Sequence, residues 1–318
     1  MKVLITGVTG FIGSNVTKKL IADGEYEVAG IVRTSSSENR LIALGNLAKD
    51  LMVYKANFTD YYALSNAVRK FAPDYVLHIG AQTAVRESFE NLHEFSETNY
   101  IGTINLIHAC LEVPNFKKFI FASTMETYGW QKIHKPFKEI ATLHPASPYA
   151  VSKAACEYYL EMASKAYNIR YLIARPCNTF GRNLNAGYIV EYLITTMLAG
   201  KDVYIGTPDF VRDLMYVDDH VNVYMTLLKS SSVNETFNFS SGSETVIREL
   251  AQKLKAMLNY RGKIIETWPP DYPLRPAVEE YLSIDASKAQ KVLGWQTEYS
   301  VEQGLNKAIT YWKKRGVT

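Results

Sequence analysis

The first residues of the chain constrain its fold most strongly. Residues 2–6 are a short apolar and β-branched run that predicts a buried strand, and residues 14–22 have a helical pattern. Between them lie Gly7, Gly10 and Gly13, with the spacing GxxGxxG. Glycines in this position permit a tight turn and the close approach of a pyrophosphate, whose charge the helix N-terminus stabilises. A glycine turn without a ligand is the alternative. We expect a dinucleotide-binding loop made of Gly7, Thr9, Gly10, Phe11, Ile12 and Gly13.

The end of the second predicted strand, residues 27–32, indicates which dinucleotide binds. Folds that prefer NAD usually place an acidic residue there, where it bonds the 2′-hydroxyl of the adenosine ribose. Here the strand is followed by Arg33 and a hydroxyl-rich stretch that includes Ser36. An arginine beside hydroxyls suits a 2′-phosphate. We therefore predict NADP, with NAD as the alternative, and expect Asn57 and Phe58 to contact the adenine.

Strands and helices alternate through the first half of the chain. Predicted strands at residues 51–54, 75–79, 118–122 and 170–174 are separated by helical patterns at residues 61–71, 95–111 and 148–167. This alternation predicts an α/β fold with a doubly wound parallel sheet. Ligands of such sheets bind at the carboxyl ends of the strands. At the end of the fourth strand, we expect the cofactor ribose and nicotinamide to approach Ile79, Gly80, Ala81 and Gln82.

The pattern becomes less regular near residue 178, which suggests a second unit. We expect residues 1–177 to form a cofactor-binding domain that also receives returning segments at about 213–240. Residues 178–318 would then form mainly a smaller, mixed C-terminal lobe that binds the substrate.

Tyr149 and Lys153 form a candidate catalytic pair. Their spacing places both side chains on one face of a helix, for which Ser147 and Pro148 are a plausible N-cap and first residue. A nearby ammonium favours a phenolate, so we expect Lys153 to lower the pKa of Tyr149 and make it a usable base. This spacing alone would also fit a Tyr/Lys pair on the surface. The predicted nucleotide-binding loop supports the catalytic interpretation.

Composition and charge exclude several other classes of protein. The chain has 318 residues, of which 35 are basic and 32 acidic, and a net charge of +3 gives no argument for a nucleic-acid or membrane partner. Its three cysteines form no CxxC pair and its six histidines show no metal spacing, so we expect no metal site. The first apolar run is too short for a signal peptide or membrane span, and we expect a cytoplasmic protein.

Five ordered motifs resemble those of the extended short-chain dehydrogenase/reductases, in particular the nucleotide-sugar epimerases and dehydratases. The motifs are the three glycines, Ser123-Thr124, Tyr149-x-x-x-Lys153, the segment Arg212-Asp213-x-x-Tyr216-Val217-Asp218-Asp219, and Asp285-x-Ser287-Lys288. The resemblance covers residues 2 to about 295. It implies a Rossmann-type fold, a nicotinamide cofactor and a nucleotide-diphosphate-sugar substrate. Asn99, Tyr149, Lys153 and Pro176 complete the cofactor-binding residues that we expect, and Lys153 would bond the nicotinamide ribose.

The resemblance also implies a reaction. Tyr149 would take the proton of the sugar 4-hydroxyl while C4 gives a hydride to NADP⁺, and Thr124 would bond the 4-oxygen. Glu126 would remove the C5 proton, and loss of water from C6 followed by hydride return would complete a 4,6-dehydration. The Arg33 loop and the Thr124-x-Glu126 motif resemble those of GDP-mannose 4,6-dehydratases. The alternatives are a nucleotide-sugar 4-epimerase, a 4-ketosugar reductase, a 5,6-dehydratase, a UDP-glucuronate decarboxylase, or a non-enzymatic NADP-binding regulatory protein.

Met125 departs from the pattern of these dehydratases, which usually place aspartate or serine at this position. A methionine transfers no proton, so Glu126 or a water would have to act as both base and acid. The departure fits an altered elimination, such as a 5,6-dehydration, in which Met125 lines a dry sugar pocket. Alternatively, Met125 only packs under the sugar.

The remaining predicted site residues are expected to bind the substrate. Asn178 and Arg212 are candidates for holding the diphosphate, and Arg275 for a further phosphate contact, because arginine suits oxyanions. Thr83, Met125, Glu126 and Arg182 complete the expected substrate site. The resemblance further implies a homodimer, formed through the helices at 95–111 and 148–167.

Overall fold

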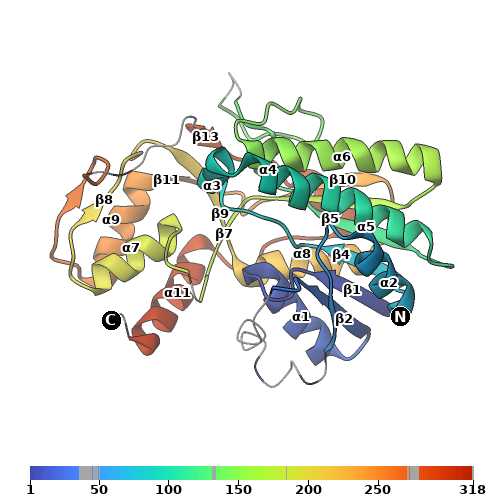
Figure 1. Cartoon of the computed structure of the whole chain (residues 1–318). Coiled ribbons are helices and arrows are strands. Elements are labelled where there is room, and N and C mark those ends of the chain that lie inside the picture. The colour runs from blue at the N-terminus through green and yellow to red at the C-terminus, as the bar shows by residue number, and fades with distance from the viewer. Residues whose placement is uncertain are drawn as a thin grey trace.

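The main sheet of the protein is parallel and has seven strands (Figure 1). The structure is a computed structural model that describes residues 1–35, 45, 49, 51–130, 134–183, 185–270, 272 and 279–316. From one edge to the other, the strands are β10 (Glu235–Phe239), β6 (Tyr171–Pro176), β5 (Lys118–Ala122), β4 (Tyr75–His78), β1 (Lys2–Thr6), β2 (Glu27–Val32) and β3 (Met52–Lys55). All six neighbouring pairs are parallel. The predicted doubly wound sheet is confirmed.

Helices cover both faces of this sheet because its strands are apolar on both sides. In β1, Val3 and Ile5 belong to one buried cluster and Leu4 to the other, as the two-residue period of a strand requires. The first cluster lies under α1 (Phe11–Asp23) and α8 (Val217–Lys229). The second lies under α2 (Tyr61–Phe71), α5 (Gly102–Leu111) and α6 (Pro148–Tyr167), which Figure 1 shows on the opposite side of the sheet. Each fully buried Val, Leu or Ile stabilises the fold by roughly 1.5–3 kcal/mol.

Helix α6 begins where the sequence predicts. The side chain of Ser147 accepts a hydrogen bond from the backbone N–H of Ala150 at 3.1 Å, and Pro148 occupies the first turn. The helix ends at Tyr167 and is capped by Asn168, whose left-handed φ of 58° an asparagine tolerates better than most residues do. The cap therefore fixes the position of Tyr149 at the start of the helix.

The helical pattern predicted at residues 95–111, with an interruption at Gly102, is helical in the structure, but it begins earlier and contains a π-turn before Gly102. After α3 (Val85–Glu90), the chain forms α4 (Leu92–Phe95), a π-helix, η2 (Ser96–Ile101), and then α5. Gly102, at the junction, packs against Phe58, where an added Cβ would lie 2.5 Å from the Phe58 Cβ. The π-helix carries Asn99, and such turns are frequent at functional sites.

The residues beyond 177 contribute to both parts of the molecule. Strand β10 joins the edge of the main sheet and α8 packs on α1, whereas β9 (Val211–Tyr216) is the centre of a separate mixed sheet. The mixed sheet contains β7 (Asn178–Phe180), β11 (Glu244–Val246) and β13 (Tyr281–Leu282) beside β9. The division at residue 177 stays a prediction.

The mixed sheet is covered by a third buried cluster with its own helices, on the left in Figure 1. These helices are α7 (Ile189–Leu198), α9 (Ile247–Leu258) and α11 (Val301–Arg315). A two-stranded sheet of β8 (Val203–Tyr204) and β12 (Ile264–Ile265) lies nearby, and α10 (Ser287–Leu293) contacts β10. Among the helices of the described residues, none is long and apolar enough to cross a lipid bilayer.

Candidate active site

Three of the four predicted catalytic residues lie together at the carboxyl edge of the main sheet. Thr124 follows β5, and its hydroxyl accepts a hydrogen bond from the N–H of Glu126 at 3.2 Å, which starts the short 3₁₀ turn η3 (Met125–Thr127). Thr124 and Glu126 both act on the pKa of Tyr149, which the Thr124 side chain lowers and the Glu126 charge raises. All three residues are at most 9% exposed. The site thus holds a phenol, a hydroxyl and a carboxylate out of bulk water.

Lys153 lies one turn further along α6, on the same face of the helix as Tyr149. Its ammonium donates to the carbonyl oxygen of Ala122 at 2.7 Å and lies 4.6 Å from the centre of the Phe121 ring. Burial lowers the pKa of Lys153 to about 8.

The pKa of Tyr149 is raised above its ordinary value, mainly by burial and then by the charge of Glu126. The hydrogen bond with Thr124 and the charge of Arg182 oppose this shift. The expected role of Lys153 in lowering the pKa of Tyr149 stays a prediction.

The glycine loop has the geometry of a phosphate cradle. Gly7 has a φ of 76°, and a Cβ there would lie 2.7 Å from the Cα of Gly80, while a Cβ on Gly13 would lie 2.1 Å from the carbonyl oxygen of Gly7. The loop, helix α1 and the end of β4 therefore touch backbone to backbone, which side chains would prevent. The N-cap of α1 is Gly10, which has no side chain to satisfy the first N–H groups of the helix. These groups fit an anionic pyrophosphate, with Thr9, Phe11 and Ile12 half-buried around them.

Asn99 braces the loop at the end of β4 through all of its side-chain groups. Its carbonyl accepts from the N–H of Gln82 at 2.8 Å, and its amide donates to the Gln82 carbonyl and to the hydroxyl of Ser152, both at 3.0 Å. Asn99 therefore positions residues 79–82 against α6, and a direct contact of its side chain with a cofactor would cost one of these bonds. Gly80 is tied to β1 by its N–H, which donates to Thr6 at 3.0 Å.

The residues expected around the adenine lie at the ends of β2 and β3. Arg33 is exposed, and Asn57 accepts hydrogen bonds from the N–H and hydroxyl of Thr34 at 3.2 and 3.1 Å. Phe58 meets His78 edge-on at 5.3 Å. The predicted contact Ser36 lies outside the described residues. Asn57 thus holds the segment that follows Arg33, in addition to any contact with a ligand.

The predicted substrate residues are less closely grouped. Thr83 is exposed after β4, Asn178 is half-buried at the start of β7, and Pro176 is buried at the end of β6. Met125 has no exposed surface and packs in the core cluster under α1 and α8, so the expectation that it lines the sugar pocket is not what the structure shows. Arg275 lies outside the described residues.

Arg212 holds neighbouring backbone in addition to any role toward substrate. Its guanidinium donates to the carbonyl oxygens of Val211 and Glu279 at 2.7 Å and of Glu280 at 3.3 Å. It also lies 5.3 Å from the centre of the Phe210 ring. These bonds connect β9 with the chain just before β13.

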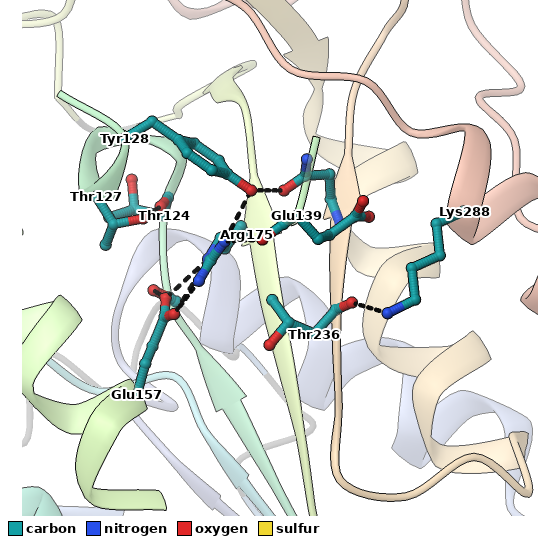
Figure 2. Close-up of polar contacts among 10 residues, drawn as sticks. Thr124, Thr127, Tyr128, Glu139, Glu157, Arg175, Thr236 and Lys288 are labelled. Carbon is teal, nitrogen blue, oxygen red and sulfur yellow. Dashed lines mark hydrogen bonds and ion pairs between the residues drawn. The ribbon is translucent and has the colours of Figure 1, made fainter. Parts of the chain in front are cut away.

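Two further residues of the predicted motifs, Asp213 and Lys288, hold segments of the chain together. Asp213 is fully buried and accepts from Ser240 at 2.5 Å and from the hydroxyl of Ser241 at 2.7 Å. Lys288 donates to the Thr236 carbonyl at 2.8 Å, which fastens α10 to β10 (Figure 2). The residues of these motifs therefore stabilise the fold, in addition to any part in binding or catalysis.

Sequence reasoning missed a buried polar network behind the catalytic residues. Arg175 on β6 forms an ion pair with Glu157 on α6, in which its Nε lies 3.1 Å from both carboxylate oxygens, and its Nη1 donates to the hydroxyl of Tyr128 at 2.8 Å (Figure 2). Glu157 also accepts from Ser123, the residue before Thr124, and Tyr128 donates to Asn238 on β10 at 2.7 Å. The available signal was spacing, since Glu157 is a charged residue on the same helix face as Tyr149 and Lys153.

Comparison with known proteins assigns the chain to a family. Residues 4–308 match the family model described as GDP-mannose 4,6 dehydratase. The chain belongs to this family. It is therefore one of the extended short-chain dehydrogenase/reductases that act on nucleotide sugars, as predicted, and its main sheet is of the Rossmann type.

Proteins that are similar to this chain have different activities. The chain is 28% identical to a dTDP-glucose 4,6-dehydratase of Haemophilus influenzae, over 98% of both chains. It is 30% identical to a UDP-glucose 4-epimerase of Thermotoga maritima, whose structure with UDP-glucose superposes with a TM-score of 0.88 over 99% of both chains. A UDP-glucose 4-epimerase of Thermus thermophilus in complex with NAD is 27% identical, with a TM-score of 0.86 over 100% of both chains.

We predict that Glu157→Ala destabilises the protein by about 3–5 kcal/mol, because it leaves the Arg175 charge buried without its carboxylate. Urea unfolding would measure the loss. The matched control is Glu161→Ala, one turn further along α6, where an exposed pair with Lys165 at 2.8 Å should contribute less than about 1 kcal/mol. Equal effects of the two substitutions would contradict a stabilising role for the buried pair.

Proposed function

We propose that this protein is a nucleotide-sugar 4,6-dehydratase that works by transient oxidation of the sugar at C4. The observation that carries the proposal is the placement of Glu126 beside Tyr149 and Thr124 in a buried site at the end of β5. An acidic residue next to the phenol suits a reaction that needs a second base. The dTDP-glucose 4,6-dehydratase relative gives independent support at family level.

Tyr149 and Thr124 would carry out the first step. Tyr149 removes the proton from the 4-hydroxyl, and the Thr124 hydroxyl, which acts on the pKa of Tyr149, holds the same oxygen. A nicotinamide ring bound at this edge supplies the acceptor, and later the donor, of the hydride. Gly7, Gly10 and Gly13 would hold its pyrophosphate, and the loop braced by Asn99 would position the ribose near Lys153.

Glu126 would carry out the second step. A ketone at C4 makes the C5 hydrogen acidic, and the Glu126 carboxylate accepts it. Because Met125 packs in the core and transfers no proton, Glu126 returns that proton to the departing C6 hydroxyl, which leaves as water. One carboxyl group thus serves as base and then as acid. The hydride taken from C4 would then add to C6, and a proton, equivalent to the one that Tyr149 took from the 4-hydroxyl, would add to C5, so that the sugar loses only one water.

We favour NADP as the cofactor and GDP-mannose as the first substrate to try. Arg33 is exposed at the end of β2 with no acidic residue directly after it, which suits a 2′-phosphate. The NAD complex of the Thermus thermophilus relative makes NAD the alternative. The family description supports GDP-mannose, and the Haemophilus influenzae relative makes dTDP-glucose the second substrate to try.

A UDP-glucose 4-epimerase is the second candidate. The Thermotoga maritima relative supports this candidate. Met125 supports it as well, because a buried methionine provides no acid for the C6 hydroxyl. An epimerase needs only the Tyr149 and Thr124 part of the site. A 5,6-dehydratase and a decarboxylase remain alternatives that product analysis separates. The assembled group of Thr124, Glu126 and Tyr149 argues against a purely regulatory protein.

Mass spectrometry of the products tests these proposals. With NADP⁺ or NAD⁺ and GDP-mannose or dTDP-glucose, we expect loss of one water, and Tyr149→Phe should lower turnover by at least about 100-fold, because it removes the base. Cofactor binding by this variant, followed by fluorescence, should be retained. An unchanged mass with a new isomer would favour the epimerase, and undiminished turnover would exclude Tyr149 as the base.

Glu126→Gln separates the two steps of the proposed reaction. The amide keeps the shape of the side chain but cannot accept the C5 proton, so we expect dehydration to fall by at least about 100-fold. Oxidation at C4, followed as nicotinamide absorbance in a single turnover, should persist. Exchange of the C5 hydrogen with solvent deuterium should stop as well. Continued dehydration in this variant would mean that another group is the C5 base.

We also propose a homodimer that forms through α6 and its neighbours. Helix α6 exposes Val151, Tyr158 and Met162 by 41–60%, and their spacing of seven and four residues puts them on one stripe. Beside this stripe lies an apolar hollow of about 420 Å³, lined by residues that include Leu92, Tyr100, Trp130 and Val151. An exposed apolar stripe next to a hollow suits a second copy of the same surface.

The double substitution Tyr158→Glu and Met162→Glu should convert the dimer to a monomer, because both copies would bury like charges. Light scattering during size-exclusion chromatography measures the mass. The control is Tyr62→Glu, which changes an aromatic residue that is 85% exposed on α2, away from α6. A wild-type protein of monomeric mass, or a double variant that stays dimeric, would contradict the proposal.

A further inference from the structure

We propose that His78 is a positioning residue for the cofactor, which it serves through a chain of buried hydrogen bonds that joins the loop at residues 79–82 to helix α6. His78 is the last residue of β4 and is only 1% exposed. It is not among the residues that the sequence assigned to the site. The inference rests on the proposed function only in that residues 79–82 contact a nicotinamide dinucleotide.

The side chain of His78 lies on the face of the sheet that α5 and α6 cover. It projects to the same side as Val76, two residues earlier in β4, which belongs to the buried cluster under these helices. Thr6, the last residue of β1, is paired with His78 in the sheet (Figure 1). Thr103 contacts the ring from the first turn of α5. The imidazole therefore lies between a hydroxyl of the sheet and a hydroxyl of a helix.

The hydrogen bonds of these two hydroxyl groups determine which ring nitrogen carries the hydrogen. Thr103 donates its single hydroxyl hydrogen to the carbonyl oxygen of Asn99 at 2.5 Å. Toward His78 Nε2, which is 2.9 Å away, the Thr103 oxygen can therefore only accept, so Nε2 carries the hydrogen. In a neutral ring Nδ1 is then an acceptor, and it receives the hydroxyl hydrogen of Thr6 at 2.8 Å. The bonds thus assign the Nε2–H tautomer.

The ring of His78 is neutral. Burial lowers its pKa to about 3, and the charge of Lys153 acts in the same direction. The rings of Phe58, Phe119 and Phe121 surround the imidazole, with centres 5.3, 5.7 and 5.9 Å away. Among the described residues, no carboxylate forms an ion pair with it. The chain of hydrogen bonds therefore keeps one arrangement of its hydrogens at every pH at which an enzyme of this kind works.

Through Thr6, His78 holds the start of the loop at residues 79–82. The Thr6 oxygen that donates to His78 also accepts from the backbone N–H of Gly80 at 3.0 Å. Gly80 lies directly against the glycine loop, since a Cβ on Gly7 would be only 2.7 Å from the Gly80 Cα. The backbone of Gly80 therefore cannot move toward Gly7 without displacing the phosphate cradle.

Through Thr103, His78 is joined to the other end of the same loop. The carbonyl group that accepts from Thr103 belongs to Asn99, whose side chain makes two hydrogen bonds to the backbone of Gln82. The same carbonyl oxygen also accepts from the thiol of Cys156 at 3.1 Å. His78 therefore acts on Gly80 and on Gln82 from one buried position.

The chain continues from Asn99 into the helix that carries the proposed base. The Asn99 amide donates to the hydroxyl of Ser152 at 3.0 Å, and Ser152 donates to the carbonyl oxygen of Tyr149 at 2.7 Å. Hydrogen bonds in such a buried chain strengthen one another, and each depends on the state of the next. The cofactor loop and the first turn of α6 are thereby held in a fixed relation that passes through His78.

The test compares Thr103→Val, which keeps the shape of the side chain, with Thr103→Ser, which keeps the hydroxyl. In Thr103→Val one buried group loses its acceptor in either tautomer, namely His78 Nε2–H or the Thr6 hydroxyl. We expect the dissociation constants of NADP⁺ and NAD⁺ to rise by about tenfold, as measured by quenching of tryptophan fluorescence without any sugar. Thr103→Ser should restore most of the affinity. Wild-type affinity in Thr103→Val would overturn the proposal.

The control for a merely structural effect is Leu106→Ala. Leu106 is buried one turn further along α5, against the same face of the sheet, and takes no part in the hydrogen bonds. Its loss should lower the temperature of unfolding and leave the dissociation constants unchanged. If Leu106→Ala weakened cofactor binding as much as Thr103→Val, general destabilisation would explain the result and the proposal would fail.

Nitrogen-15 NMR of the histidine rings examines the chain directly in the wild-type protein. Protonated and unprotonated ring nitrogens have separate shifts, and the His78 signals are those that Thr103→Val alters. We expect the Nε2–H tautomer, unchanged between about pH 6 and 8. Bound cofactor should also slow the hydrogen exchange of the Gly80 N–H less in Thr103→Val than in the wild type. An Nδ1–H tautomer in the wild type would refute the assignment.

These measurements are separate from the outcome for the proposed function. Cofactor affinity and ring tautomer are both read without a nucleotide sugar. If no sugar is turned over although the cofactor binds, the proposed dehydratase fails and the role of His78 is still decided. If turnover is found but Thr103→Val binds the cofactor as the wild type does, the proposed function stands and the role of His78 is refuted.

Discussion

The ion pair between Arg175 and Glu157 holds the candidate active site together. It joins β6 to α6 under the catalytic residues, and through Ser123 and Tyr128 it extends to the end of β5 and to β10. Such a pair is stable only when its remaining donors and acceptors are also satisfied, and here neighbouring hydroxyl and carbonyl groups satisfy them. The helix with Tyr149 and the strand that leads to Thr124 are therefore fixed relative to each other before any ligand binds.

Burial explains most of the unusual protonation behaviour around this site. It lowers the pKa of Lys153 and His220 and raises that of Tyr149, because in each case the charged form loses its hydration. A dry site makes each remaining charge more effective, since the surrounding dielectric is low. The protein therefore needs few charged groups here, and the position of each has a large effect.

The sequence predicts those features that depend on local chemistry. The glycine loop, the strand and helix alternation, and the start of α6 at Ser147 and Pro148 follow from neighbouring residues, and the structure agrees with them. The features that it does not predict depend on distant partners. Gly102 meets Phe58, and Glu157 meets Arg175, only after the sheet has formed. A methionine side chain such as Met125 suits either a pocket or the core, and only the packing shows that it belongs to the core.

The π-helix at Ser96–Ile101 lets one continuous helical segment contact two different surfaces. An α-helix advances by about 100° per residue, so a wider turn that holds an extra residue shifts the helical phase of everything that follows it. The backbone remains helical from Leu92 to Leu111, yet the residues before and after the π-turn face different directions. Asn99 can therefore point to the loop at Gln82 while Leu106 and Cys110 face the sheet. Deleting one residue from this turn would restore a regular helix and rotate one of the two surfaces away from its partner.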